Sequence, residues 1–252
     1  MFPAVSNIRL TNNSIEILEG INFPQALCFL NLNCNLVVNL PLQLNVLLSN
    51  LECLHLSNNR IASLEAVVFP PRLKVLNLNF NDILSLQNVT LPGQLETLSM
   101  TDNAITTLDN VDFPTTLQEL SLSNAVWQVQ DRSRNRIASL QGARLRACSA
   151  LHTLDLSRNV IESLPQGAPG AFPDSLSDLR LSGNRITHLQ ECVLPSELRR
   201  LWLEHNLIDN LQGYAFPPQL TFLALALNPI MNNNPNANAI GILVPPGCSV
   251  FI

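Results

Sequence analysis

Residues 51–64 read LECLHLSNNRIASL, and this stretch decides the architecture of the chain. Leu54 and Leu56 are two positions apart, so in a short strand both side chains point to the same face while their neighbours point to the other. Asn59 follows that strand, and Ile61 and Leu64 continue the apolar pattern beyond it. A unit of this size cannot bury its own apolar face. The stretch therefore predicts one member of a stack of similar units.

The same pattern, Leu-x-x-Leu-x-Leu-x-x-Asn-x-Ile-x-x-Leu, recurs ten times along the chain. Six of the nine intervals between successive copies are 22 residues long, and the other three are 24, 34 and 25 residues. Self-similarity at a fixed period indicates a repeat architecture. The copies begin at Val5, Leu27, Leu51, Leu73, Leu95, Leu117, Leu151, Leu176, Leu198 and Leu220.

Position 9 of the pattern is Asn in every copy. It follows the strand, where the chain turns inward, and a buried amide there can satisfy backbone donors and acceptors of adjacent turns. We expect a structural ladder formed by Asn13, Asn35, Asn59, Asn81, Asn103, Asn135, Asn159, Asn184, Asn206 and Asn228.

These residues resemble the leucine-rich repeat family over nearly the whole chain. The resemblance implies an α/β repeat solenoid, a horseshoe whose concave side is a parallel β-sheet of about ten strands. The second half of the repeat ends in Phe-Pro at Phe69, Phe113 and Phe216, and about nine residues with a proline leave no room for a long helix. We expect a largely irregular or 3₁₀ convex side with little helix, and a column of Phe packed into the core. The Phe-Pro variant is similar to arrays on receptor-like kinases.

The repeat array spans residues 1–230, and residues 231–252 form an Asn/Pro-rich loop followed by a partial eleventh repeat. Residues 244–251 match residues 216–223, which predicts an eleventh strand. Phe2-Pro3 looks like the tail of a preceding repeat. Terminal repeats normally need a polar cap. Two interpretations follow: a fragment of a longer protein, which we favour, or a small array whose degenerate ends act as caps.

Ten extra residues, 125–134, split the sixth repeat between Ser123 and Asn135. Two hypotheses fit this insertion. It is either a functional loop or an error of the gene model such as a retained intron, because its removal restores the repeat spacing as far as Leu140.

Composition excludes several classes of function. With 46% hydrophobic residues the chain can form a continuous core, and its net charge of −5, with Lys74 as the only lysine, argues against nucleic acid as a partner. The N-terminus lacks the basic and apolar regions of a secretory signal. The most apolar window, residues 36–48, is interrupted by polar residues and proline, so we expect no direct insertion into a membrane.

Motifs for catalysis or metal binding are absent from the sequence. The six cysteines include no Cys-x-x-Cys pair and no clustered four-cysteine flank, and the four histidines have no paired ligand spacing. Asp155 and Asp178 lie on adjacent predicted strands, but many such carboxylate pairs arise in a repeat protein. We therefore expect no metal, no cofactor and no enzymatic activity. Cysteines that look unpaired favour the cytoplasm, although a receptor fragment would be extracellular, and acceptor patterns for glycosylation start at Asn12 and Asn88.

Function is then expected on the concave face, at the variable positions beside the inward leucines. In the first six repeats, positions 5 and 7 carry mostly small polar residues, whereas the last four repeats concentrate charged and aromatic residues. Trp and Arg combine a large contact area with directional hydrogen bonds, as interface hot spots do. The alternative is that the charges form salt bridges across strands and the Trp fills a local gap. The sequence predicts a monomeric scaffold with a protein-binding patch made of Asp155, Arg158, Asp178, Arg180, Arg200, Trp202, Glu204 and His205.

Overall fold

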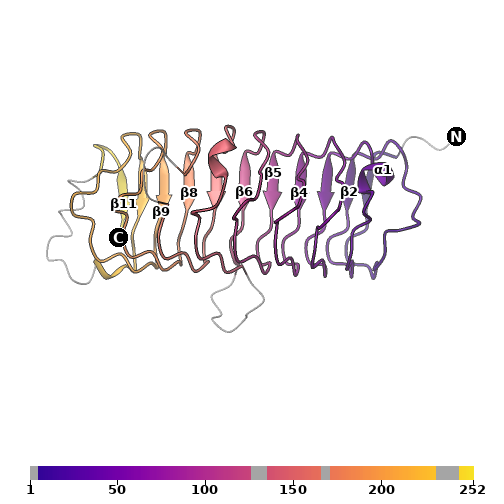
Figure 1. Cartoon of the computed structure of the whole chain (residues 1–252), viewed down its shortest axis with the longest axis horizontal. Coiled ribbons are helices and arrows are strands. Elements are labelled where there is room, and N and C mark those ends of the chain that lie inside the picture. Colours follow the sequence, from indigo (N-terminus) through magenta and orange to yellow (C-terminus); the bar gives the residue numbers. More distant parts are fainter. Residues whose placement is uncertain (1–4, 126–134, 166–170, 231–243) are drawn as a thin grey trace.

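The computed structural model describes residues 5–125, 135–165, 171–230 and 244–252. The chain winds into an elongated solenoid whose turns stack along the long axis, and each turn adds one short strand to the same face (Figure 1). The strands form one 11-stranded sheet in sequence order, and every neighbouring pair is parallel. This confirms the predicted solenoid with a parallel sheet along one side.

All eleven strands are three residues long. They are β1 (Asn7–Arg9), β2 (Phe29–Asn31), β3 (Cys53–His55), β4 (Val75–Asn77), β5 (Thr97–Ser99), β6 (Glu119–Ser121), β7 (Thr153–Asp155), β8 (Asp178–Arg180), β9 (Arg200–Trp202), β10 (Phe222–Ala224) and β11 (Ser249–Phe251).

Helix is scarce, as the Phe-Pro half-repeat predicts. Within the described residues the helical segments are the single turn α1 (Leu44–Leu47), the 3₁₀ turn η1 (Leu145–Ala147) and the two residues 229–230. Both α1 and η1 lie in repeats that are two residues longer than the 22-residue unit once the insertion at 125–134 is set aside. The added residues give the convex side enough chain for one helical turn. None of the described helices has the length and apolar character required to cross a membrane.

The core follows the repeat pattern. The inward leucines, such as Leu54 and Leu56, are fully buried. The Phe residues of the convex side, Phe69, Phe113 and Phe216, are also buried, so they form the expected spine against the leucine layer. One continuous apolar cluster therefore runs the length of the array.

Asn103 shows how the ladder connects neighbouring turns. Its Nδ2 donates to the carbonyl oxygens of Met100 at 3.1 Å and of Leu78, one repeat earlier, at 2.9 Å. Its Oδ1 accepts a hydrogen bond from the backbone N–H of Ile83 at 3.1 Å. The side chain is fully buried, and so each amide replaces water for backbone groups in two turns. Asn13 at the first rung is exposed and bonds only to the carbonyls of Leu10 and Thr11.

Position 8, immediately before the ladder, adopts the left-handed conformation in most repeats, with φ of 59° at Asn58, 60° at Arg158 and 60° at Leu227. This conformation is costly for bulky residues and is kept only where surrounding contacts fix the turn. The ladder supplies those contacts, and the chain can then change direction at a single residue.

The chain on both sides of the insertion is held by hydrogen bonds. The Asn124 Nδ2 donates to the Asn135 carbonyl oxygen at 2.9 Å and also to that of Arg158, and the Ala125 N–H donates to Asp102 Oδ2 at 2.9 Å. Asn135 occupies its rung of the ladder, with Nδ2 at 2.9 Å from the Met100 oxygen. The repeat therefore resumes in register. Residues 126–134 lie outside the described residues, so neither hypothesis for the insertion is decided.

The eleventh strand is present, but its register corrects the sequence alignment. The alignment places Phe251 opposite Leu223, in the inward column. In the structure Val250 pairs with Leu223, and Phe251 pairs with Ala224 on the concave face. The strand begins one residue earlier after its turn than in the other repeats, and a slip of one residue exchanges the two faces of a strand.

Replacing Asn103 by Leu should lower the free energy of unfolding by about 2–4 kcal/mol, because three backbone groups lose their partner in a buried site. Chemical denaturation monitored by circular dichroism measures the change. The matched control is Asn13→Leu on the exposed first rung, for which we expect a loss of less than about 1 kcal/mol. Equal losses for the two variants would contradict the ladder as the source of stability.

Deleting residues 125–134 should leave the melting temperature unchanged or raise it. The deletion joins Asn124 to Asn135 and recreates the Asn58-Asn59 junction of the third repeat, and asparagine tolerates the left-handed conformation needed at position 8. Scanning calorimetry of the deleted and intact chains tests this. A fall of more than about 5 °C would mean that the array depends on the insertion.

Candidate functional site

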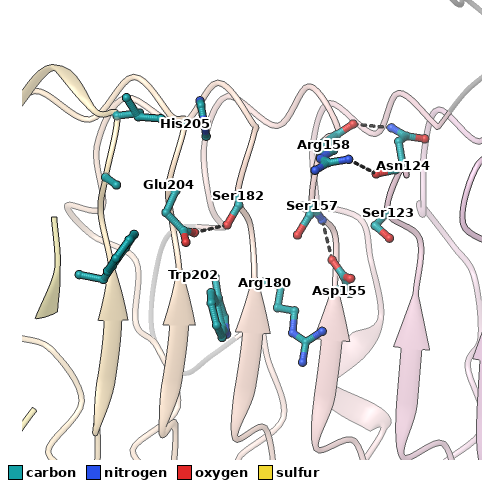
Figure 2. Close-up of a pocket in the computed structure, with 13 residues that line it drawn as sticks. Ser123, Asn124, Asp155, Ser157, Arg158, Arg180, Ser182, Trp202, Glu204 and His205 are labelled. Atoms are coloured by element: carbon teal, nitrogen blue, oxygen red, sulfur yellow. Dashed lines mark hydrogen bonds between the residues drawn. The ribbon is translucent and has the colours of Figure 1, made fainter. Parts of the chain in front are cut away.

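The concave face carries a groove of about 610 Å³ over its C-terminal half (Figure 2). It crosses the strands instead of following them, because its residues come from successive turns between β6 and β11. It is lined by Ser123, Asn124, Asp155, Ser157, Arg158, Arg180, Ser182, Trp202, Glu204, His205, Ala226, Leu227 and Phe251.

The repeat positions explain the shape of this groove. Its floor is position 7, which carries the small residues Ser123, Ser157, Ser182 and Ala226, interrupted by Glu204. One wall is position 5, at the ends of the strands, and holds Asp155, Arg180, Trp202 and Phe251. The other wall is position 8, in the left-handed turns, and holds Asn124, Arg158, His205 and Leu227. Small residues between two columns of larger ones leave a furrow perpendicular to the strands.

Gly183 interrupts the second wall, and this makes room for Arg158. The glycine has φ of +73°, and a Cβ placed on it would lie 3.0 Å from the Arg158 Cγ. Arg158 donates from Nη1 to the carbonyl oxygen of Ala125. The arginine is therefore held between the base of the insertion and the glycine of the next turn.

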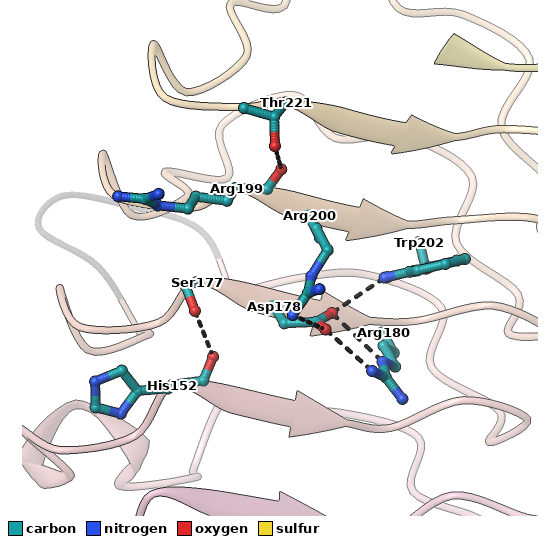
Figure 3. Close-up of polar contacts among 8 residues, drawn as sticks. All are labelled: His152, Ser177, Asp178, Arg180, Arg199, Arg200, Trp202 and Thr221. Carbon is teal, nitrogen blue, oxygen red and sulfur yellow. Dashed lines mark hydrogen bonds and ion pairs between the residues drawn. The ribbon is translucent and has the colours of Figure 1, made fainter. Parts of the chain in front are cut away.

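Asp178 organises the side chains beside the groove (Figure 3). Its side chain is only 1% exposed, and its carboxylate accepts hydrogen bonds at 3.0 Å from Arg180 Nη2 and at 3.0 Å from Trp202 Nε1. It also forms an ion pair with Arg200 Nη2 at 3.0 Å. These hydrogen bonds and the two ion pairs offset the cost of burying one carboxylate. Arg180 and Arg200 remain 43% and 54% exposed, so the buried anion fixes two cations that still face solvent.

Aromatic contacts extend this cluster toward the end of the array. The Trp202 ring packs on Phe222 with centroids 4.5 Å apart, and the Arg180 guanidinium lies 5.9 Å from the Trp202 centroid. The hydrogen bond to Asp178 raises the pKa of Arg180 above its usual value, with further contributions from the charges of Asp178, Asp155 and Glu119, while partial burial acts in the opposite direction. Arg180 is permanently charged.

The structure brings the predicted patch together in two layers. Asp155, Arg158, Arg180, Trp202, Glu204 and His205 line the groove, whereas Asp178 and Arg200 lie beside it. Asp178 is the buried anchor of the cluster. A salt bridge between strands, which the sequence allows as an alternative, is present between Arg200 on β9 and Asp178 on β8, whereas Arg180 pairs with Asp178 within β8. Both arginines stay accessible.

Seven residues of the groove are absent from the predicted patch: Ser123, Asn124, Ser157, Ser182, Ala226, Leu227 and Phe251. Leu227 is 66% exposed and Phe251 is 58% exposed. Reading position 8 together with position 5 would have found Leu227 and Asn124. No sequence signal places Phe251, because its alignment with the inward leucines is off by one residue.

A smaller cluster with a similar contact lies at the other end of the sheet. His55 on β3 packs on Phe29 with ring centroids 5.3 Å apart, and the Arg9 guanidinium lies 5.4 Å from the Phe29 centroid. The Cys53 Sγ is 3.8 Å from the His55 Nε2. Burial, assisted by the charge of Glu52, raises the pKa of the Cys53 thiol, and burial lowers the pKa of His55. Both shifts favour the neutral pair, so this contact does not generate a nucleophilic thiolate.

The described residues contain no group of three or more His, Cys, Asp or Glu side chains placed to hold a metal ion. The six cysteines are unpaired in the structure, and two of them, Cys148 and Cys192, are buried. Burial raises the pKa of the Cys148 thiol to about 11 and that of Cys192 to about 12. These two thiols are therefore protonated and inert at neutral pH.

Comparison with known proteins is consistent with this geometry. Models of the leucine-rich repeat match residues 149–208 and residues 50–70. These stretches of the chain are leucine-rich repeats. Arrays of this family are typically non-catalytic and serve as protein-interaction modules.

Two solved structures illustrate the likeness. YopM from Yersinia enterocolitica WA-314 is 27% identical with a TM-score of 0.49, and the match covers 90% of this chain and 52% of YopM. An internalin from Listeria monocytogenes is 20% identical with a TM-score of 0.42, and the match covers 89% of this chain and 81% of the internalin. The chain thus spans about half the length of YopM. A search of curated proteins found no match.

Proposed function

We propose that this chain is a non-catalytic recognition module that binds a protein partner over the C-terminal half of its concave face. The binding surface consists of the groove and the adjoining cluster around Asp178. Charges of both signs alternate there, with Asp155 and Glu204 beside Arg158 and Arg180. A mixed surface of this kind suits a protein partner better than the uniformly negative backbone of a nucleic acid.

The observation that carries the proposal is the fixed position of Trp202. Its indole N–H is bonded to a buried carboxylate, its ring packs on Phe222, and it remains partly exposed in the wall of the groove. A side chain held in this way loses little conformational freedom on binding, and tryptophan and arginine are the residues most enriched in interface hot spots. Trp202, Arg180 and Arg200 form a preorganised hot spot.

The same contacts argue against acid–base catalysis by the Asp155 and Asp178 pair. A general acid or base must reach the substrate proton. The Asp178 side chain is 1% exposed, is already paired with two arginines and accepts a hydrogen bond from a tryptophan. Asp155 accepts the Ser157 N–H at 2.9 Å. Their role in the proposal is structural.

An intracellular regulator is the favoured setting for this module. The six cysteines form no disulfide in the structure, and an environment that keeps thiols reduced suits them. A monomer suffices, because the proposed surface is contained in one chain.

The alternative is an ectodomain fragment of a receptor-like kinase that binds an extracellular ligand. The Phe-Pro repeat favours it, and so does the exposure of Asn88 and Thr90, which belong to an acceptor pattern for glycosylation.

Trp202→Ala should weaken binding to the partner by about 2 kcal/mol, or roughly 30-fold in Kd. Immobilised wild-type, Trp202→Ala and His55→Ala chains are compared in capture from an extract with quantitative mass spectrometry. His55 is the matched control because it occupies position 5 of its repeat, at the end of β3, as Trp202 does at the end of β9. His55 packs on Phe29 much as Trp202 packs on Phe222. Partners retained by His55→Ala but lost by Trp202→Ala support the proposal. Equal capture by all three chains would move the binding surface elsewhere.

Protein isolated from its natural source should carry six free thiols and no glycan. Alkylation in denaturant without a reducing agent, followed by mass spectrometry of the intact chain, counts the thiols. Thiols blocked from alkylation, or a glycan on Asn12 or Asn88, would replace the intracellular setting by the ectodomain alternative.

A further inference from the structure

The groove is narrow, because its walls are close together along the chain. Positions 5 and 8 are three residues apart, so the backbone between them spans at most about 10 Å, and the turn at position 8 shortens this distance. A helix with its side chains is about 10–12 Å across and would need the whole of that width. The floor is one repeat position wide. Its shape therefore suits a peptide that crosses the strands in an extended conformation.

The charged part of the groove favours an acidic guest. The two carboxylates that line it already accept hydrogen bonds, Asp155 from the Ser157 N–H and Glu204 from the Ser182 hydroxyl. Arg180 differs from them. The Nε and Nη2 of Arg180 donate to Asp178, and among the described residues Nη1 donates no hydrogen bond. A carboxylate of the guest can pair with the remaining N–H groups of a guanidinium that is already fixed in position.

The other part of the groove is apolar. Trp202, Leu227 and Phe251 line it, and Ala226 forms its floor. Leu227 and Phe251 are more than half exposed, so large apolar surfaces remain in contact with solvent at one end of the furrow. Covering them with an apolar side chain is favourable by the hydrophobic effect.

The register of the sheet sets the spacing between these two parts. Arg180 pairs with Trp202, Trp202 with Ala224, and Ala224 with Phe251, so each of these residues lies on the strand directly beside that of the one before. At about 4.8 Å per strand, Phe251 is about 14 Å from Arg180. An extended peptide rises about 3.3 Å per residue and presents alternate side chains to one face, so residues i, i+2 and i+4 span about 13 Å.

We propose that the groove binds an extended peptide segment of the partner in which an acidic residue at position i is followed by apolar residues at i+2 and i+4, or preceded by them at i−2 and i−4. The acidic side chain pairs with Arg180, the first apolar side chain contacts Trp202, and the second lies between Leu227 and Phe251. This inference rests on the proposed function, because it assigns a chemistry to the partner at the same surface.

Fluorescence anisotropy with labelled peptides tests the proposal on the full chain. The probes are acetyl-Ser-Glu-Ser-Leu-Ser-Leu-Ser-amide and its reversed sequence, because the groove does not fix the chain direction. Each has a counterpart with Lys in place of Glu. We expect at least one Glu peptide to bind about tenfold or more tighter than its Lys counterpart. Equal binding of the Glu and Lys peptides, or no binding of any probe at millimolar concentration, would overturn the inference.

Variants assign the two ends of the peptide. Arg180→Gln should remove the preference for Glu over Lys, whereas the matched control Arg185→Gln, an exposed arginine 4.0 Å from Glu162 and outside the groove, should keep it. The double variant Leu227→Ser with Phe251→Ser should weaken the Glu peptide at least about fivefold while the preference for Glu remains. Preference that survives Arg180→Gln in a folded chain contradicts the assignment. The solvent-exposed Leu227 and Phe251 give a second readout that does not disturb the Asp178 cluster.

The result is separable from the test of the proposed function. Capture of a partner that depends on Trp202, together with failure of every peptide, would support a protein-binding surface and reject the extended acidic segment. Capture that does not depend on Trp202, together with clear discrimination between the Glu and Lys peptides, would support the extended acidic segment and reject Trp202 as the anchor of the proposed surface.

Discussion

The structure depends on one recurring interaction, the bond between a buried asparagine amide and the backbone of two neighbouring turns. Each turn of the solenoid ends a three-residue strand and sends the chain inward, which would leave peptide groups without partners in an apolar interior. The amide of a residue such as Asn103 satisfies these groups and ties its turn to the preceding one. The leucines supply the driving force for stacking, but the asparagines decide that the turns stack in one register.

The same constraint creates the surface on which function is proposed. Because the ladder fixes the turn, position 8 is held in the left-handed conformation even at residues such as Arg158 and Leu227. Their side chains then form one wall of the groove, opposite the wall at position 5. Where position 7 is small in the last turns, this regular backbone leaves a furrow between the two walls. The last turns of the array carry charged and aromatic side chains in both walls, and the proposed binding surface lies there.

Asp178 illustrates why the role of a charged residue in a repeat is ambiguous from sequence. Its position in the sequence allows either an exposed contact or a bridge between strands, because side chains of neighbouring strands lie within reach of one another. The structure shows that it is buried and that Arg180, Arg200 and Trp202 converge on it. In the proposed function, a carboxylate of this kind contributes to recognition indirectly, by holding the exposed groups of the surface in place.

The sequence by itself determined the repeat, the parallel sheet, the scarcity of helix, the inward leucines and six of the residues that line the groove. Each of these follows from local periodicity, since the strand alternation and the Asn position are written in every copy. Tertiary structure alone decided the burial of Asp178, the furrow between positions 5 and 8, and the place of Phe251 on the concave face. Burial and convergence depend on side chains from different turns, and a change of one residue in a single turn exchanges the two faces of a strand.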